Sequence, residues 1–250
     1  MDKKIKILGV IPARIGSTRL KEKMLADLCG KTVIQRTYEQ AKTVKYLDDI
    51  VIATDSEKIK NVAESFGARV IITSIKNMNG TEAVAEAVSK FEDFVPDIVV
   101  NIFGDEPLIP ADAIEDSIML LINDEAAVVS GVAQEISEES DAKDDSFVLI
   151  TFDKYNNILS FSRSIFPYPY NKKFQIPWYQ ILGSMAFRRD FLFKYASLEQ
   201  TPLELYEGIE QLRILENGYK MKVAVGNFNA VGINTVKDLE RAREILGCIK

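Results

Sequence analysis

Three basic side chains are spaced through a short loop near the start of the chain. Residues 5–11 form an apolar run that predicts a buried strand, and Pro12, which has no backbone donor, is expected to end it. Around Gly16 the loop then carries basic and hydroxyl side chains: Arg14, Ser17, Thr18, Arg19 and Lys23. Exposed amides, hydroxyls and cations gathered in one small volume bind phosphate oxygens. The loop therefore predicts a polyphosphate site.

The position of this loop favours a ligand site over a merely solvated surface loop. In open α/β sheets, ligands bind at the carboxyl ends of the strands, and this loop directly follows the first predicted strand. It contains neither the Gly-x4-Gly-Lys-[Ser/Thr] pattern of a Walker loop nor the Gly-x-Gly-x-x-Gly pattern of a dinucleotide site. A different kind of nucleotide loop is indicated.

An acidic pair lies at the end of another predicted strand. Asp105 and Glu106 follow the apolar residues 97–103 and precede Pro107, which keeps them in a loop at the carboxyl edge of the sheet. One alternative is that the aspartate only caps the helix that follows. Beside the cationic loop, however, Asp105 could hold Mg²⁺ shared with a triphosphate, because Mg²⁺ is usually bound by one or two carboxylates plus phosphate oxygens.

The elements that must position these two loops alternate between strand and helix. Apolar runs predict strands at 50–54, 70–72, 97–103 and 127–132. One helix is predicted before each of these strands, at 32–46, 57–66, 82–91 and 113–122. Thr32, Ser56 and Thr81 are the expected N-caps. This alternation predicts an α/β fold with a doubly wound, mostly parallel sheet.

The second half of the chain begins with a change of pattern. Residues 135–145 are acidic and are interpreted as a solvated surface segment. Residues 147–152 and 158–163 predict a hairpin, within an antiparallel excursion over 147–188 that contains a strand at 181–187. A helix at 207–217, a strand at 221–225 and a helix at 236–246 then complete the α/β pattern.

Composition narrows the functional classes. The chain has 250 residues, 47% of them hydrophobic, which suits one large α/β domain. Its net charge of −6 disfavours a nucleic-acid partner, and no apolar stretch is long enough to span a membrane. The absence of histidine excludes Ser-His-Asp and Cys-His catalysis. Cys29 and Cys248 are far apart and have no metal-ligand spacing, so a reduced cytoplasm is the simplest location.

Three motifs resemble those of the 3-deoxy-manno-octulosonate (Kdo) cytidylyltransferases. They are Pro-Ala-Arg-x-Gly-Ser-Thr-Arg-Leu-x-x-Lys at 12–23, Gly-Asp-Glu-Pro at 104–107 and Gly-Thr-Glu at 80–82. In the third, Asn79 and Ala83 stand where the family has Ser and Arg. The resemblance implies catalytic roles for Arg14, Arg19, Lys23 and Asp105, with Asp105 as a Mg²⁺ ligand. It implies nucleotide contacts from Pro12, Ala13, Arg14, Gly16, Ser17, Thr18, Arg19, Lys23, Thr54, Asp55, Gly80 and Thr81.

The resemblance extends, with departures, to the acceptor. Phe-Ser-Arg at 161–163 and Glu-Gln-Leu-Arg at 210–213 match the family and imply acceptor contacts from Arg163, Glu210 and Gln211. Where the family has Gln, His and Tyr, this chain has Phe103, Ile181 and Met185, which are expected to line the same pocket. Asn234 replaces a second acidic metal ligand.

The function implied by this resemblance is transfer of CMP from CTP to the hydroxyl of a Kdo-like 2-keto-3-deoxy sugar acid, for cell-surface polysaccharide synthesis. Residues 1–250 would form one domain, with residues 147–188 covering the acceptor and pairing two subunits into a homodimer. Two alternatives remain open. The acceptor could be another sugar or a phosphorylated polyol, or the chain could be a non-catalytic nucleotide-binding protein.

Overall fold

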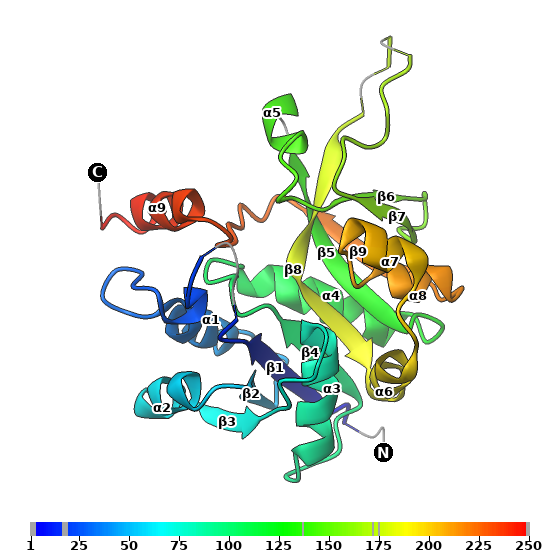
Figure 1. The fold of residues 1–250 in the computed structure, drawn as a ribbon. Helices are drawn as coiled ribbons and strands as arrows, with labels where there is room; N and C mark the ends of the chain where they lie inside the picture. The colour runs from blue at the N-terminus through cyan, green and yellow to red at the C-terminus, as the bar shows by residue number, and fades with distance from the viewer. Residues whose placement is uncertain (1–3, 17–19, 137, 172, 175, 249–250) are drawn as a thin grey trace.

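The computed structural model describes residues 4–16, 20–136, 138–171, 173–174 and 176–248. Within these residues, nine strands form one sheet with the order β3-β2-β1-β4-β8-β5-β9, and β6 pairs with β7 and β8 (Figure 1). The strands are β1 (Ile7–Ala13), β2 (Asp49–Thr54), β3 (Arg69–Ile72), β4 (Ile98–Ile102), β5 (Val129–Ile136), β6 (Leu149–Phe152), β7 (Ile158–Ser162), β8 (Trp178–Arg188) and β9 (Met221–Gly226). The helices are η1 (Lys23–Leu25), α1 (Val33–Ala41), α2 (Glu57–Ser65), α3 (Gly80–Lys90), α4 (Ala111–Asn123), α5 (Glu139–Ala142), α6 (Arg189–Ser197), α7 (Pro202–Glu207), α8 (Leu212–Glu216) and α9 (Val236–Ile245).

The expected α/β fold with a mostly parallel sheet is confirmed. Strands β3, β2, β1 and β4 are parallel neighbours, and β9 is parallel to β5. The antiparallel part differs from the expectation in one respect, since β8 lies between β4 and β5 and pairs antiparallel with both. The final strand of the predicted excursion is therefore a central strand of the main sheet.

The first strand also runs further than expected. Pro12 was expected to end it, but β1 continues to Ala13, and Pro12 pairs with Ala53 of β2. On its other side the ladder with β4 stops at Val10, so Pro12 lies beyond the part of the strand that is paired on both edges. A residue without an N–H is tolerated at such a position.

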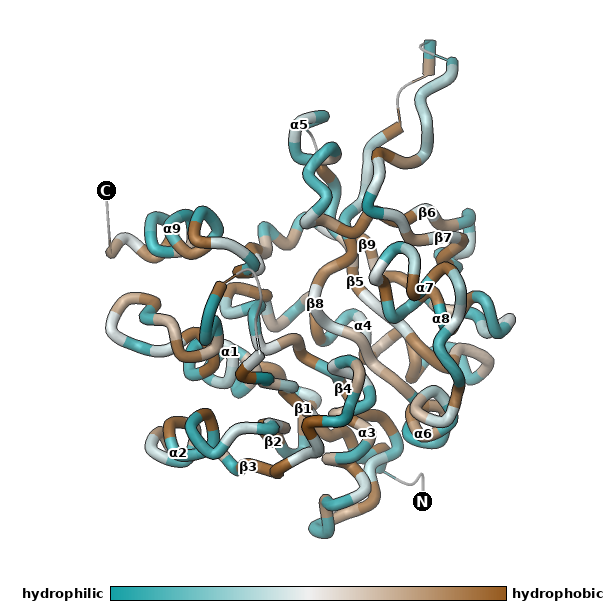
Figure 2. The backbone as a smooth tube through the Cα atoms, in the orientation of Figure 1, coloured by the Kyte–Doolittle hydropathy of each residue, from teal (hydrophilic) through white to brown (hydrophobic). Residues whose placement is uncertain are grey.

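Helices cover both faces of the sheet, and each face has its own apolar core. Helices α1, α2 and α4 pack on one face through residues such as Ile34, Ile59 and Ile118. Helices α3, α6 and α8 pack on the other through residues such as Val84 and Leu192. Figure 2 shows the hydrophobic segments concentrated in the sheet and on the inner sides of these helices. Among the described residues, no helix is both long and apolar enough to cross a membrane.

Two of the expected helix caps are confirmed. The side chains of Thr32 and Ser56 accept hydrogen bonds from backbone amides in the first turns of α1 and α2. The third cap is wrong: Asn79 caps α3, and Thr81 lies inside the first turn with its hydroxyl turned to other partners. The expected helix over 207–217 is also interrupted, because Gly208 adopts a left-handed conformation with φ of 64° and ends α7.

The acidic segment at 135–145 is largely exposed, as expected, although it contains the short helix α5. Ile136 and Ala142 are buried against Leu149 of β6. These apolar contacts attach the segment to the hairpin of β6 and β7.

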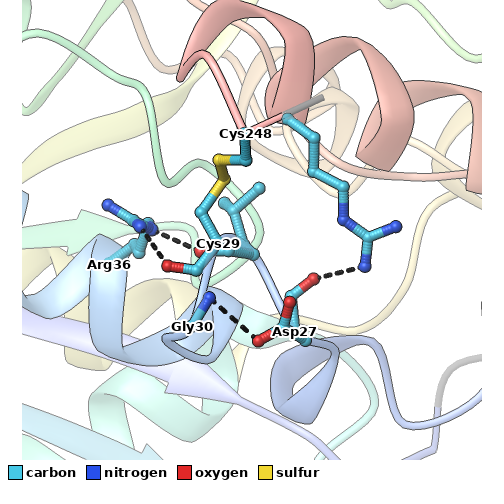
Figure 3. The surroundings of a disulfide bond; sticks show 7 residues. Asp27, Cys29, Gly30, Arg36 and Cys248 are labelled. Atoms are coloured by element: carbon cyan, nitrogen blue, oxygen red, sulfur yellow. Dashed lines mark hydrogen bonds between the residues drawn. A yellow bond between two sulfur atoms is a disulfide. The ribbon is translucent and has the colours of Figure 1, made fainter. Parts of the chain in front are cut away.

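The two cysteines, which the sequence left unpaired, are joined. Cys29 and Cys248 form a disulfide with Cα atoms 5.8 Å apart across a sequence separation of 219 (Figure 3). Close by, Arg243 donates to the carbonyl of Asp27 at 2.6 Å. Leu239 of α9 packs with Leu28 in a small separate core. Helix α9 is thus fixed against the segment that follows η1.

Candidate active site

A cavity of about 310 Å³ lies at the carboxyl edge of the parallel strands. Its walls come from the segments after β1 and β4, from η1, and from the start of α3, so separate parts of the chain converge there. The lining residues are Pro12, Arg14, Gly16, Lys23, Met24, Gly80, Phe103, Gly104, Asp105 and Glu210. Six of these residues, Pro12, Arg14, Gly16, Lys23, Gly80 and Asp105, were predicted to contact a nucleotide or a metal.

The cationic loop is held in place by Asp55. Its carboxylate accepts a hydrogen bond from the amide of Ile15 at 3.2 Å and lies 3.9 Å from Nε of Arg14. Arg14 also donates to the carbonyl of Met78 at 3.2 Å, while its side chain remains 38% exposed. The guanidinium is therefore anchored on one side and open to a ligand on the other.

Lys23 lies deeper in the cavity, between the two residues predicted to bind metal. Its Nζ donates to Oδ2 of Asp105 at 2.5 Å and to Oδ1 of Asn234 at 3.3 Å. The side chain of Lys23 is only 8% exposed. Because residue 234 directly precedes the cap of α9, the docking of that helix brings the amide oxygen to Lys23. The predicted convergence of positions 23, 105 and 234 is observed.

The donor set at this point suits a hard cation. Asp105 and Asn234 turn oxygens toward one position, and Mg²⁺ prefers oxygen ligands. In the described part of the chain, no group of three or more acidic or cysteine side chains could hold a metal ion by itself. The residues therefore fit a metal that takes its remaining ligands from a substrate phosphate and water.

The structure separates the acidic pair. Asp105 faces Lys23, whereas the carboxyl group of Glu106 lies over the backbone of Gly183 and Gly232. A Cβ atom added to either glycine would come within 3 Å of the Glu106 side chain. Its Oε2 is enclosed and has no hydrogen-bond partner among the described residues. Burial first, and then the charge of Asp105, raises the pKa of Glu106 to about 8. Glu106 therefore keeps its proton to a higher pH than an exposed glutamate does.

A second cavity of about 300 Å³ adjoins the first. All of the residues predicted to bind the acceptor line it: Phe103, Arg163, Ile181, Met185, Glu210 and Gln211, together with Asn234. Residues that were not predicted also line it, including Asn79, Ser146 and Gln180. Asn79 stands out in the sequence only as the residue that replaces a serine of the Gly-Thr-Glu motif, and nothing in the local sequence distinguishes Ser146 or Gln180 from ordinary surface residues. Sequence reasoning therefore did not place these three residues in this cavity.

The three departures from the family pattern form one apolar surface. Ile181 and Met185 of β8 both lie against Gly131 of β5, where a Cβ atom on the glycine would meet their side chains at 3.1 and 3.8 Å. Phe103 donates its backbone N–H to Gly183 at 2.7 Å, which places it on the adjoining strand end beside them. Phe103, Ile181 and Met185 therefore make one part of the cavity lining apolar, and Glu106 packs over Gly183 nearby.

Two of the expected acceptor contacts have other partners in this structure. The guanidinium of Arg163 donates to the carbonyls of Asp145, Glu207 and Gly208. The side-chain amide of Gln211, which is 7% exposed, donates to the sulfur of Met185 at 3.6 Å. Both side chains thus help to hold the cavity walls together.

Glu210 lies where the two cavities meet. Its Oε1 accepts a hydrogen bond from the hydroxyl of Thr81 at 2.9 Å, and its Oε2 accepts a longer one from the amide of Thr81 at 3.4 Å. The same hydroxyl accepts from Nδ2 of Asn101 at 3.1 Å. Burial is the largest influence on this carboxyl and raises its pKa to about 7, although both bonds from Thr81 act in the opposite direction.

Four of the predicted nucleotide contacts lie outside both cavities. Ala13 and Thr54 are fully buried in the sheet, and Thr81 is 2% exposed. Asp55 is used to position the loop, as described above. Ser17, Thr18 and Arg19 lie outside the described residues.

Comparison with known proteins agrees with this geometry. Residues 8–223 match the family model described as "Cytidylyltransferase". This match places the chain in a class of nucleotidyltransferases.

Individual relatives define the family more closely. The 3-deoxy-manno-octulosonate cytidylyltransferase of Francisella tularensis subsp. holarctica (strain LVS) is 46% identical over 242 residues, covering 94% of this chain and 96% of the relative. The enzyme of that name from Solibacter usitatus (strain Ellin6076) is 38% identical, covering 96% and 94%. A solved structure of CMP:2-keto-3-deoxy-manno-octonic acid synthetase complexed with CTP superposes with a TM-score of 0.89 at 32% identity, covering 97% of this chain and 99% of the other. The chain belongs to the 3-deoxy-manno-octulosonate cytidylyltransferase family.

Proposed function

We propose that the protein transfers CMP from CTP to a hydroxyl of 3-deoxy-manno-octulosonate and releases pyrophosphate, a step of cell-surface polysaccharide synthesis. The observation that carries this proposal is the pair of adjoining cavities, which share Phe103, Asp105 and Glu210. The first cavity, with Arg14 and Lys23 in its wall, suits a triphosphate, and the second cavity is of a size for a sugar acid. The names of the relatives supply the identity of both substrates.

The reaction follows from this arrangement. The acceptor oxygen attacks the α-phosphorus of CTP in line, and the bond from that phosphorus to the leaving pyrophosphate breaks. Arg14 and Lys23 stabilise the negative charge that develops on the phosphate oxygens, and the adjoining walls hold the two reactants in contact. Arg19 has the same predicted role.

Mg²⁺ is the proposed cofactor, with Asp105 and Asn234 as its protein ligands. When bound, it would neutralise charge on the triphosphate and on the departing pyrophosphate. Before that, the ammonium group of Lys23 provides the positive charge beside Asp105. Asn234 contributes a neutral oxygen, so we expect weaker metal binding than at a site with two carboxylates.

One observation favours testing a second acceptor class. The apolar side chains of Phe103 and Ile181 in the lining offer no hydrogen bonds to hydroxyl groups that lie against them, and Met185 behind them is buried. The same chemistry on a less hydroxylated sugar acid, another sugar or a phosphorylated polyol is therefore the second candidate function.

We also propose that the chain acts as one domain over residues 1–250 and as a homodimer. The proposed cytoplasmic location now rests on the substrate CTP alone, because the disulfide of Cys29 with Cys248 removes the argument from unpaired cysteines. The segment between β7 and β8 projects from the body of the molecule (Figure 1). It exposes Tyr168, Tyr170, Phe174 and Ile176, each by more than 60%. Exposed apolar residues gathered in one segment mark surfaces that contact another molecule, and a second copy of the chain is the partner we propose. Light scattering after size exclusion tests this proposal, and a monomeric mass would contradict it.

The experiment that tests the function is pyrophosphate release with CTP and a panel of acceptors. We expect release with 3-deoxy-manno-octulosonate and none with CTP alone. Release only with a different acceptor would select the second candidate function. CTP binding without release from any acceptor would leave a nucleotide-binding protein and contradict both candidate functions.

A further inference from the structure

The acceptor hydroxyl must lose a proton during the proposed reaction, and the chain contains no histidine to receive it. The group that receives it must reach the place where the acceptor meets the α-phosphorus. Of the described residues, only three line both cavities: Phe103, Asp105 and Glu210. Phe103 cannot accept a proton, and Asp105 already has the ammonium group of Lys23 at 2.5 Å.

We propose that Glu210 is the general base that accepts the proton of the acceptor hydroxyl. This inference rests on the proposed function and adds a catalytic role to a residue expected only to contact the acceptor. The O–H bond of the acceptor breaks and its proton goes to Oε2 of Glu210. The freed oxygen forms a bond to the α-phosphorus, and pyrophosphate leaves with the electron pair of the broken P–O bond. The proton is later released to solvent.

The contacts of Glu210 orient its carboxylate for this role. Oε1 receives the hydroxyl of Thr81 at 2.9 Å and the amide of Gln211 at 3.4 Å. Among the described residues, Oε2 receives the backbone amide of Thr81 alone, at 3.4 Å. One oxygen is therefore fixed by two donors, while the other has room for a second hydrogen bond from a ligand.

The charged groups around Glu210 have opposing effects on the pKa of its carboxyl group. Arg213, which pairs with Glu204 of α7 and Glu82 of α3, favours the ionised carboxylate, and Glu204 disfavours it. From α6, Tyr195 donates its hydroxyl to the backbone carbonyl of Glu210 at 3.3 Å. The pKa that results, about 7, suits a base at neutral pH, since about half of the carboxyl groups are ionised there and the carboxylate holds a proton better than an exposed glutamate does.

The experiment is the pH dependence of kcat/KM for the wild type and for Glu210→Gln, with CTP, Mg²⁺ and 3-deoxy-manno-octulosonate. The wild-type rate is expected to rise with pH through an apparent pKa near 7, because the protonated carboxyl cannot accept a proton. Glu210→Gln should lower kcat by about 100-fold or more and remove this rise. CTP binding, measured by calorimetry, should remain within a few-fold of the wild type.

Glu106→Gln is the matched control, because Glu106 is the other carboxyl group in the second cavity with a raised pKa. It should keep the rise near pH 7. A rise that persists in Glu210→Gln, or that disappears in Glu106→Gln instead, would overturn the assignment. A raised KM for the acceptor with unchanged kcat would also overturn it, since Glu210 would then only bind.

A second variant decides the question if Glu210→Gln fails to fold. Thr81→Val removes the hydroxyl that stabilises the ionised form of Glu210, so the rise should move to higher pH. An unchanged profile in a folded Thr81→Val protein would contradict the proposal. Should the wild type itself release no pyrophosphate with any acceptor, the proposed function fails, which is a different result from an active wild type whose profile does not depend on Glu210.

Discussion

Replacing Lys23 tests whether the buried cation acts on the reaction. Lys23→Met keeps the approximate length of the side chain and removes both the bond to Asp105 at 2.5 Å and the bond to Asn234 at 3.3 Å. Because the ammonium group already lies in the cavity before substrate binds, it is placed to stabilise the charge that develops in the transition state. Loss of one such donor costs about 2.7–4 kcal/mol, which corresponds to a fall of about 10²–10³-fold in kcat.

The assay is steady-state pyrophosphate release at saturating Mg²⁺. The loss should appear mainly in kcat, since a contact made chiefly in the transition state lowers kcat and kcat/KM together. Lys58→Met is the matched control, because Lys58 pairs with Glu22 at 2.6 Å on the surface, with side chains 59% and 40% exposed. A surface pair is worth about 0–1 kcal/mol, so this variant should keep wild-type kinetics. An unchanged kcat/KM for CTP in a folded Lys23→Met protein would refute the role of Lys23.

Three other substitutions make separate predictions. Asn234→Asp should lower the Mg²⁺ concentration that gives half of the maximal rate and should raise kcat, since a carboxylate binds Mg²⁺ better than an amide does. A higher KM for the acceptor would show instead that an anionic group of the acceptor lies beside position 234. Arg213→Met should lower the free energy of unfolding, measured by chemical denaturation, by about 3–5 kcal/mol. The reason is that Glu204, whose side chain is only 5% exposed, would lose the guanidinium nitrogen that lies 2.6 Å from its Oε1. A change below about 1 kcal/mol would contradict this prediction. Cys248→Ser should lower the melting temperature of the oxidised protein and remove its response to reductant. A disulfide that closes so long a loop stabilises the folded state by up to about 5 kcal/mol. Identical melting of the wild type with and without reductant would contradict the disulfide.

Local sequence patterns correctly predicted most of the strands and helix caps that position the site. The buried strands around residues 50–54 and 98–102 and the caps at Thr32 and Ser56 follow from apolar periodicity and side-chain chemistry, which act over a few residues. The meeting of Lys23 with Asp105 also followed, because the carboxyl ends of parallel strands share one edge of the sheet.

Other features depend on contacts between distant segments and could not be predicted in this way. The insertion of β8 between β4 and β5 is a choice of strand order, which apolar patterning does not specify. The pairing of Cys29 with Cys248 depends on the docking of α9. Similarly, α3 begins at Gly80 with Asn79 as its cap, and the hydroxyl of Thr81 contacts Glu210, more than a hundred residues away.

The central claim is tested most directly by following the phosphorus atoms of CTP with ³¹P NMR in the presence of Mg²⁺ and 3-deoxy-manno-octulosonate. The proposal predicts a new CMP-sugar phosphodiester signal that grows together with an equal amount of pyrophosphate. Intact CTP that binds the protein but yields neither signal, with this acceptor or with any other keto-deoxy sugar acid, would contradict it.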